Sequence, residues 1–326
     1  MLSYSPFQRG RVPFGTRCVC GDRPCGRQAK TKGEKAMARG KRVKIDDRDA
    51  LYHVTSRITG QRMLLRDDGT KRDMLDALRR SAEFSGVDVG AFALMDNHFH
   101  IVLRVPCPAG TVPEGEVLRR YRALAGRTRM ECLAERVVRL RDGGDALGAE
   151  ALLERLRARM HDLSQFVKTF KEEFGRRFRA RNPYSGTIWG GRFKSTLVEE
   201  AEYLRACAEY VELNPVRAGL SRRAEDYAWN TVGASARGDA FALRCRRWLL
   251  GVLGGCGDRP LDEGALMKRQ PQIGSGRIFG SAGFVQAMLW RFADSMRSSR
   301  AKPRKVGGNA FASHGWMLAG KRGNAA

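Results

Sequence analysis

The chain has 326 residues, 42% of them hydrophobic, which is enough for one large domain or two modest ones. It carries 60 Lys and Arg against 35 Asp and Glu, for a formal net charge of +25. Such a charge favours a polyanionic partner, above all nucleic acid, over a basic surface that merely maintains solubility. The chain contains no apolar run long enough to cross a membrane and no apolar core of a secretion signal. We therefore expect a cytoplasmic, nucleoid-associated protein.

The two ends of the chain are basic and rich in glycine. Residues 1–44 hold 12 Lys and Arg against two acids, and residues 288–326 hold eight against one. We expect residues 1–43 to be a flexible tail that touches phosphates without reading sequence. A cysteine cluster in this tail has no second pair or histidine to complete a zinc site, and it comprises Cys18, Cys20 and Cys25. Met37 is a second candidate for the start codon, and residues 1–36 would then be a poor basis for inference.

The first structured elements follow in the order strand, helix, strand, strand. Residues 50–58 are rich in β-formers and predict a strand. Residues 67–86 place apolar side chains at helical spacing and end at a glycine. Residues 87–95 and 98–105 predict two strands joined by a tight turn at Asp96-Asn97, which is a β-hairpin.

A long charged helical region comes next and precedes a second strand–helix unit. Residues 113–182 are helical in pattern, with a break at "DGGDALG". A short strand is predicted at 193–198, and a helix follows that ends at Asn214-Pro215. This order fits an α+β fold, a ferredoxin-like antiparallel sheet with helices packed on it. The main domain is predicted to span residues 44–235, and residues 236–326 to form a basic C-terminal helical extension.

Two of the five histidines lie one residue apart in "LMDNHFHIVLR". On a strand, alternate residues point to the same face, so His98 and His100 project together while Phe99 projects to the other side. Neighbouring imidazoles can bind one divalent metal, and a half-buried polar face with hydrogen-bonded histidines is the other interpretation. A metal beside a basic surface can polarise a phosphodiester.

A tyrosine on the last helix of this unit offers a nucleophile. The residues Tyr203, Cys207, Tyr210 and Asn214 recur at helical spacing and form one inward-facing stripe. A tyrosine in such a stripe is more often a core residue than a catalytic one. Tyr210 with Asn214 one turn later could nevertheless present a hydroxyl and an oxygen ligand to a phosphate, if a cation activates the phenol.

Four segments in this order resemble a known family: "MDNHFHIVLR", "GTIWGGRFKSTLVEE", "AEYVELNPVRAGL" and "EDYAWNT". The chain resembles the single-tyrosine HUH transposases of bacterial insertion sequences, in the branch of REP-associated tyrosine transposases. The resemblance runs from about residue 44 to 235, and it implies the HUH endonuclease fold. The compact members of this family lack the basic tails of this chain, and they also lack its helical insertion at residues 113–160.

The resemblance implies a metal-dependent transesterification of single-stranded DNA near hairpins. His98, His100 and Asn214 would hold Mg²⁺ or Mn²⁺, and Tyr210 would form a 5′-phosphotyrosine link. Tyr203 and Glu212 stay open as alternative nucleophile and ligand. The enzyme would act as a monomer or a homodimer, and it would have no membrane partner.

The DNA would lie on basic and aromatic side chains. The candidates for DNA binding are Arg176, Arg177, Arg179, Arg192, Lys194 and Trp189. An ordinary solvated face is the alternative for the five cations, and core packing is the alternative for Trp189. The alternative function is a domesticated protein that binds hairpin DNA without cleaving it, and an RNA-binding sheet is a further one.

Overall fold

The computed structural model describes residues 42–254, 276–292, 303–305 and 315–319. These residues fall within one compact unit, residues 39–326. The predicted N-terminal tail, with its cysteine cluster, lies outside the described residues except at its last two positions. At that point Val43 is already buried in the main core.

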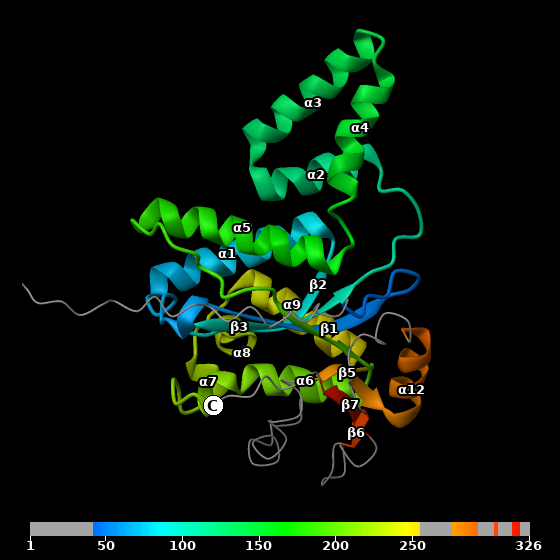
Figure 1. Ribbon diagram of the computed structural model, residues 1–326. Coiled ribbons are helices and arrows are strands. Elements are labelled where there is room, and N and C mark those ends of the chain that lie inside the picture. The colour runs from blue at the N-terminus through cyan, green and yellow to red at the C-terminus, as the bar shows by residue number, and fades with distance from the viewer. Residues whose placement is uncertain (1–41, 255–275, 293–302, 306–314, 320–326) are drawn as a thin grey trace, which may run out of the picture. The chain divides into compact units, whose positions relative to one another are not determined.

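A mixed sheet forms the centre of the described chain (Figure 1). Its strand order is β2-β3-β1-β4-β5-β7-β6. The strands are β1 (Ala50–Arg57), β2 (Asp88–Leu94), β3 (His98–Val105), β4 (Lys194–Val198), β5 (Gly276–Ser281), β6 (Pro303–Lys305) and β7 (Gly315–Ala319). Strand β3 is antiparallel to both β1 and β2, so β1 and β2 run parallel with β3 between them. This is the split β-α-β arrangement that the sequence predicts, and β4 extends it antiparallel to β1.

The predicted hairpin is confirmed. Strands β2 and β3 pair from Asp88 with Arg104 to Leu94 with Phe99. The register shifts between Val89 and Ala91, which is a bulge at Gly90. A β-carbon on Gly90 would lie 2.6 Å from the ring of Trp248, so this glycine lets a helix approach the strand closely.

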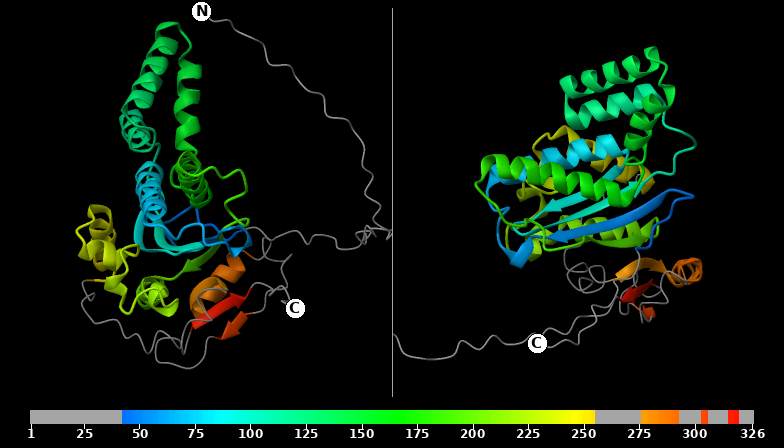
Figure 2. Two further views of the ribbon diagram at one scale, coloured as in Figure 1. Left: turned by 90° about the vertical axis from the view of Figure 1, so that its left-hand side faces the viewer. Right: turned by 45° about the horizontal axis from the view of Figure 1, so that its top comes forward.

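Helices α1 (Asp68–Ser85) and α5 (Leu163–Arg181) cover one face of the sheet (Figures 1 and 2). Each begins at an aspartate whose side chain accepts a backbone N–H of the first turn. Gly86 ends α1 with φ of 64°, as its place in the sequence predicts. Alternate residues of β3, beginning with Phe99, pack with the phenylalanines of α5 in the main core.

Helices α6 (Glu202–Glu212) and α7 (Asn214–Arg217) lie on the opposite face of the sheet, as Figure 1 shows. The sequence predicts that Asn214-Pro215 ends this helix, but the chain continues helically through a break at Leu213. Pro215 occupies the first turn of α7, where the missing N–H of proline leaves no helical bond unmade. The remaining elements here are the 3₁₀ turns η1 (Thr59–Gln61) and η2 (Ala224–Asp226), and the helices α8 (Thr231–Ala236) and α9 (Ala240–Val252).

The predicted helical insertion is a three-helix unit with a small core of its own. Its helices are α2 (Glu114–Ala125), α3 (Arg127–Asp142) and α4 (Ala146–Arg157). The break at "DGGDALG" is confirmed, since Asp145 caps α4 by accepting from Gly148. Phe84 of α1 joins this core, so the insertion packs on the first helix of the sheet domain.

The C-terminal part differs from the expected helical extension. Helix α12 (Ala282–Arg291) is present, but three strands, β5, β7 and β6, continue the sheet beyond β4. Strand β5 runs parallel to β4, with Leu197 opposite Ile278. Segments this short carry little periodic signal. Strand β5 pairs with the backbone groups at the edge of β4, β7 pairs with β5, and β6 pairs with β7.

Candidate active site

The two histidines of the hairpin lie on the sheet face that is turned to α6. The register of β1 and β3 sets His100 opposite Thr55 and His98 opposite Arg57. Two residues along β1 from Thr55, His53 points to the same face. Strand alternation therefore collects three of the five histidines of the chain on this face.

The Nδ1 atom of each hairpin histidine lies within hydrogen-bond distance of another side chain. His100 Nδ1 lies 2.9 Å from His53 Nε2, and the two rings stack at an interplanar angle of 9°. His98 Nδ1 lies 2.6 Å from the side-chain oxygen Oδ1 of Asn97. Since that oxygen only accepts, Nδ1 of His98 carries the proton. Nε2 is then the nitrogen with a free lone pair in a neutral ring.

The surroundings keep these imidazoles neutral. Burial, together with the nearby Arg57 guanidinium, lowers the pKa of His98 to about 4. Burial and the adjacent imidazoles hold the pKa of His100 well below its usual value. A neutral imidazole with an oriented ring and an open Nε2 is the form that binds a metal.

Helix α6 places Tyr210 against the histidine rings. The Tyr210 ring meets His100 edge-on, with ring centroids 5.7 Å apart, and His53 at 5.8 Å. One turn later, Asn214 Nδ2 donates to the backbone oxygen of Tyr210 at 3.0 Å. This bond engages the amide nitrogen and leaves the amide oxygen Oδ1 for another partner.

Arg217 lies over the face of the Tyr210 ring. Its guanidinium carbon is 4.1 Å from the ring centroid, and its Nη2 donates to the Tyr210 backbone oxygen at 2.8 Å. Its Nε and Nη1 atoms are buried and have no hydrogen-bond partner among the described residues. Burial raises the pKa of Tyr210, and the Arg217 cation opposes that rise.

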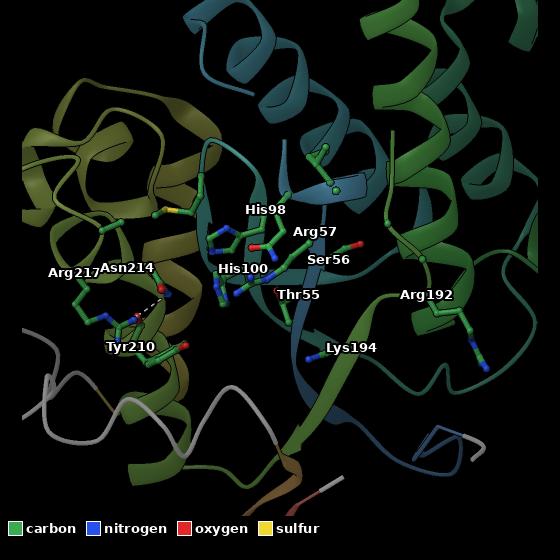
Figure 3. A pocket seen from close by; sticks show the side chains of 17 residues that line it. Thr55, Ser56, Arg57, His98, His100, Arg192, Lys194, Tyr210, Asn214 and Arg217 are labelled. Carbon is green, nitrogen blue, oxygen red and sulfur yellow. Dashed lines mark hydrogen bonds between the residues drawn. The ribbon is translucent and has the colours of Figure 1, made fainter. Parts of the chain in front are cut away.

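These side chains line a cavity of about 670 Å³ (Figure 3). In that view Tyr210, Asn214 and Arg217 lie on one side of the histidines, and Arg192 and Lys194 on the other. The lining includes the cations Arg57, Arg192, Lys194 and Arg217 and contains no Asp or Glu. A cavity of this charge accommodates an anion such as a phosphodiester.

The structure brings together six of the predicted site residues and places four elsewhere. The six that line the cavity are His98, His100, Tyr210, Asn214, Arg192 and Lys194. The four outside its lining are Arg176, Arg177, Arg179 and Trp189.

The three arginines lie on α5 and have partners of their own. Arg176 and Arg177 both bind Glu173, and Arg177 also binds Asp76. Arg179 donates to the backbone oxygen of Gly175. These side chains contribute to the surface of α5 rather than to the cavity.

Trp189 packs in the core. Its ring meets Phe99 and Phe174 edge-on, and its Nε1 faces the backbone oxygen of Lys171. This is the packing alternative that the sequence leaves open for Trp189.

The alternatives to Tyr210 and Asn214 lie outside the cavity lining. Tyr203 packs edge-on against Phe279, and its buried hydroxyl has no hydrogen-bond partner among the described residues. Glu212 is fully enclosed, and burial raises its pKa to about 8. Both side chains are on α6, but the cavity meets that helix only at Tyr210.

Sequence reasoning missed three residues of this site: His53, Arg57 and Arg217. The first two were readable in "ALYHVTSRI", because alternation along this strand places them on one face with Thr55. Arg217 follows Tyr210 by two helical turns. Helical spacing alone could indicate it, although the break at Leu213 makes the register uncertain from sequence.

The described part of the chain holds no cluster of three or more His, Cys, Asp and Glu side chains arranged for a metal ion. The imidazole and amide side chains that line the cavity are His98, His100, Asn214 and Gln61. Within the described residues no helix is both long and apolar enough to span a bilayer.

Comparison with protein-family models found no match, and comparison with curated proteins found none either. Among solved structures, the chain is similar to one of a REP-associated tyrosine transposase bound to a REP hairpin. The two are 16% identical, with a TM-score of 0.39. The similarity covers 62% of this chain and 87% of the other.

Proposed function

We propose that this protein cleaves and rejoins single-stranded DNA through a covalent link to Tyr210. One observation carries the proposal: a tyrosine is held against the neutral imidazole of His100 in a cationic cavity without carboxylates. A phosphodiester supplies the anion that this lining accommodates, and the tyrosine is the nucleophile that stands beside it.

The donor set fits a divalent metal. His98 donates through Nδ1 to Asn97, and the tautomer of His100 that donates through Nδ1 to His53 likewise leaves Nε2 for an ion. Asn214 donates through Nδ2 and leaves Oδ1. These three side chains would hold Mg²⁺ or Mn²⁺ together with oxygens of the substrate. When bound, the ion would draw negative charge from the scissile phosphate.

The remaining chemistry belongs to the chain itself. The Tyr210 hydroxyl oxygen attacks phosphorus, the bond from phosphorus to the 3′ oxygen breaks, and a 5′-phosphotyrosine forms. The phenol proton ends on the departing 3′ oxygen. Because one phosphodiester bond replaces another, the step needs no ATP. Attack by a 3′-OH on the phosphotyrosine reverses these changes and rejoins a strand.

Arg217 is suited to assist this step. Its cation over the ring favours the phenolate of Tyr210, and its two unpartnered buried N–H groups can donate to a phosphate oxygen. His53 is a positioning residue, since its contact with His100 Nδ1 fixes the orientation of the ligand ring.

The experiment incubates the protein with labelled single-stranded oligonucleotides from the flanks of its own gene, with Mg²⁺ or Mn²⁺. A labelled band at the mass of the protein on a denaturing gel is the expected product. It should disappear in Tyr210→Phe and in His98→Ala. The matched control is Tyr203→Phe, which removes a hydroxyl from the same helix outside the cavity and should retain the band. An adduct that persists in Tyr210→Phe would refute the assignment of the nucleophile.

A second candidate is a protein that binds hairpin DNA without cutting it. The observation in its favour is the burial of Tyr210, which is 7% exposed and whose pKa is raised. Tight hairpin binding, with no adduct under either metal, would support this function instead.

A further inference from the structure

A group of cations without acidic partners surrounds the mouth of the cavity. We call it the rim cluster, and it consists of Arg42, Arg57, Lys171, Arg192 and Lys194. Three of them line the cavity. None of the five forms an ion pair with any described residue, although the chain has 35 acids.

The 190–194 segment holds this cluster together by crossing the end of β1. Gly190 N donates to the backbone oxygen of Arg57 at 2.9 Å. Lys171 reaches from α5 and donates through Nζ to the backbone oxygen of Gly191 and to Ser56 Oγ, both at 3.1 Å. Lys171 thereby touches two residues of the cavity lining from the opposite face of the sheet.

Arg42 closes the cluster on the other side of the same segment. Its Nη2 donates to the backbone oxygen of Phe193 at 3.3 Å, and its guanidinium carbon lies 3.7 Å from the centroid of that ring. Lys194 stands opposite Thr55 in the strand register. The five cations thus form one continuous group from the cavity to the start of the described chain.

The like charges act on one another. Burial and then Arg192 lower the pKa of Arg42, and the Asp162 carboxylate opposes this in part. Burial and then Arg42 lower the pKa of Lys171 to about 8. Elsewhere the chain neutralises its arginines, as Glu173 does for Arg176 on α5. An uncompensated cluster destabilises the free protein, and a polyanion relieves that repulsion.

We propose that the rim cluster is the track along which the backbone of a single DNA strand reaches the cavity. This inference rests on the proposed function and deepens it, because it assigns the strand path to the 190–194 segment rather than to the arginines of α5. A strand with several phosphates can contact all five cations, whereas a single phosphate in the cavity can contact only those that line it. Tyr210 is 7% exposed, so a phosphate reaches it on an unpaired strand and not within a duplex.

The experiment measures binding of a fluorescent single-stranded oligonucleotide by anisotropy over a range of salt, in the Tyr210→Phe background without metal. The variants are Arg42→Gln and Lys171→Gln, with Lys171→Arg as a charge-preserving rescue. The matched control is Arg136→Gln, which removes the same charge from an exposed position on α3. Thermal unfolding of each variant verifies that it is folded.

Each rim variant should lower the magnitude of the slope of log K against log salt by about 0.7, the value for one lost phosphate contact on a single strand. Extrapolated from 1 M to 0.15 M salt, that slope corresponds to roughly fourfold weaker binding. Lys171→Arg should restore the slope, and Arg136→Gln should leave it unchanged.

Two outcomes would overturn the track. Unchanged slopes in Arg42→Gln and Lys171→Gln would do so, and so would a loss confined to Arg176→Gln and Arg179→Gln, which would move the path to α5. A failure of the proposed function looks different, because the rim variants would still weaken binding while no protein–DNA adduct forms with the unsubstituted chain.

Discussion

Replacing His53 tests the site without using catalysis. His53 and His100 are 1% and 6% exposed, and their ring nitrogens are 2.9 Å apart. His53→Leu removes the partner of His100 Nδ1 and puts an apolar side chain of similar size in its place. His53→Gln introduces an amide that can reach His100 Nδ1. His161→Leu is the matched control, because His161 precedes α5 outside the cavity lining.

Two effects follow from the lost contact in His53→Leu. A buried Nδ1 atom without a partner costs about 1–3 kcal/mol of stability. Loss of the partner that orients a metal-binding imidazole weakens metal affinity by about 10- to 100-fold. We therefore expect a lower free energy of unfolding and a large loss of Mn²⁺ affinity in His53→Leu. Both should recover substantially in His53→Gln.

The measurements are calorimetric titration with Mn²⁺ and urea unfolding without metal. His161→Leu should bind Mn²⁺ with the affinity of the unsubstituted chain. The reasoning is refuted if His53→Leu binds Mn²⁺ normally, or if His53→Gln loses as much affinity as His53→Leu. The latter result would mean that packing of the imidazole, and not its hydrogen bond, supports the site.

Three further predictions concern the surroundings of the site. Lys71→Met should destabilise the fold by about 3 kcal/mol in urea unfolding, because the largely buried carboxylate of Asp96 loses its 2.7 Å partner and keeps the 3.7 Å pair with the exposed Arg66; an unchanged midpoint would contradict this. Since the pKa of Lys171 is about 8, its charge is present below pH 8 and lost above it, so single-strand binding should weaken from pH 7 to 9. In Lys171→Arg the same anisotropy titration should show no such loss. Gly90→Ala should lower the free energy of unfolding by about 1–3 kcal/mol, because its β-carbon would meet the Trp248 ring, and a neutral result would show that the ring yields.

The proposals differ in what they need from the chain. Cleavage requires Tyr210 and the histidines to act together, whereas the rim cluster requires only unpaired charge at the cavity mouth. A protein that lost its nucleophilic function could therefore keep the rim cluster and still bind DNA. The adduct assay and the salt slopes separate these two properties.

Short-range interactions account for the local elements and for the pairing of the two histidines, and these are readable from the sequence. Strand alternation fixes His98 and His100 on one face whatever surrounds them, and the capping residues and Gly86 mark helix ends through short-range hydrogen bonds and backbone geometry. Helical spacing likewise places Tyr210 and Asn214 one turn apart. These features depend on residues that are close in sequence, within one helical turn or one strand.

Which side chains meet in the site depends on long-range packing. His53 joins His100, Arg217 covers Tyr210, and Lys171 reaches the cavity rim across 115 residues of sequence from Ser56. The same holds for β5, which pairs with β4, and for β7 and β6, which pair beyond it, since this pairing outweighs their weak local pattern. Non-local contacts of this kind arise from sheet register and from the burial of whole faces, which no single segment specifies.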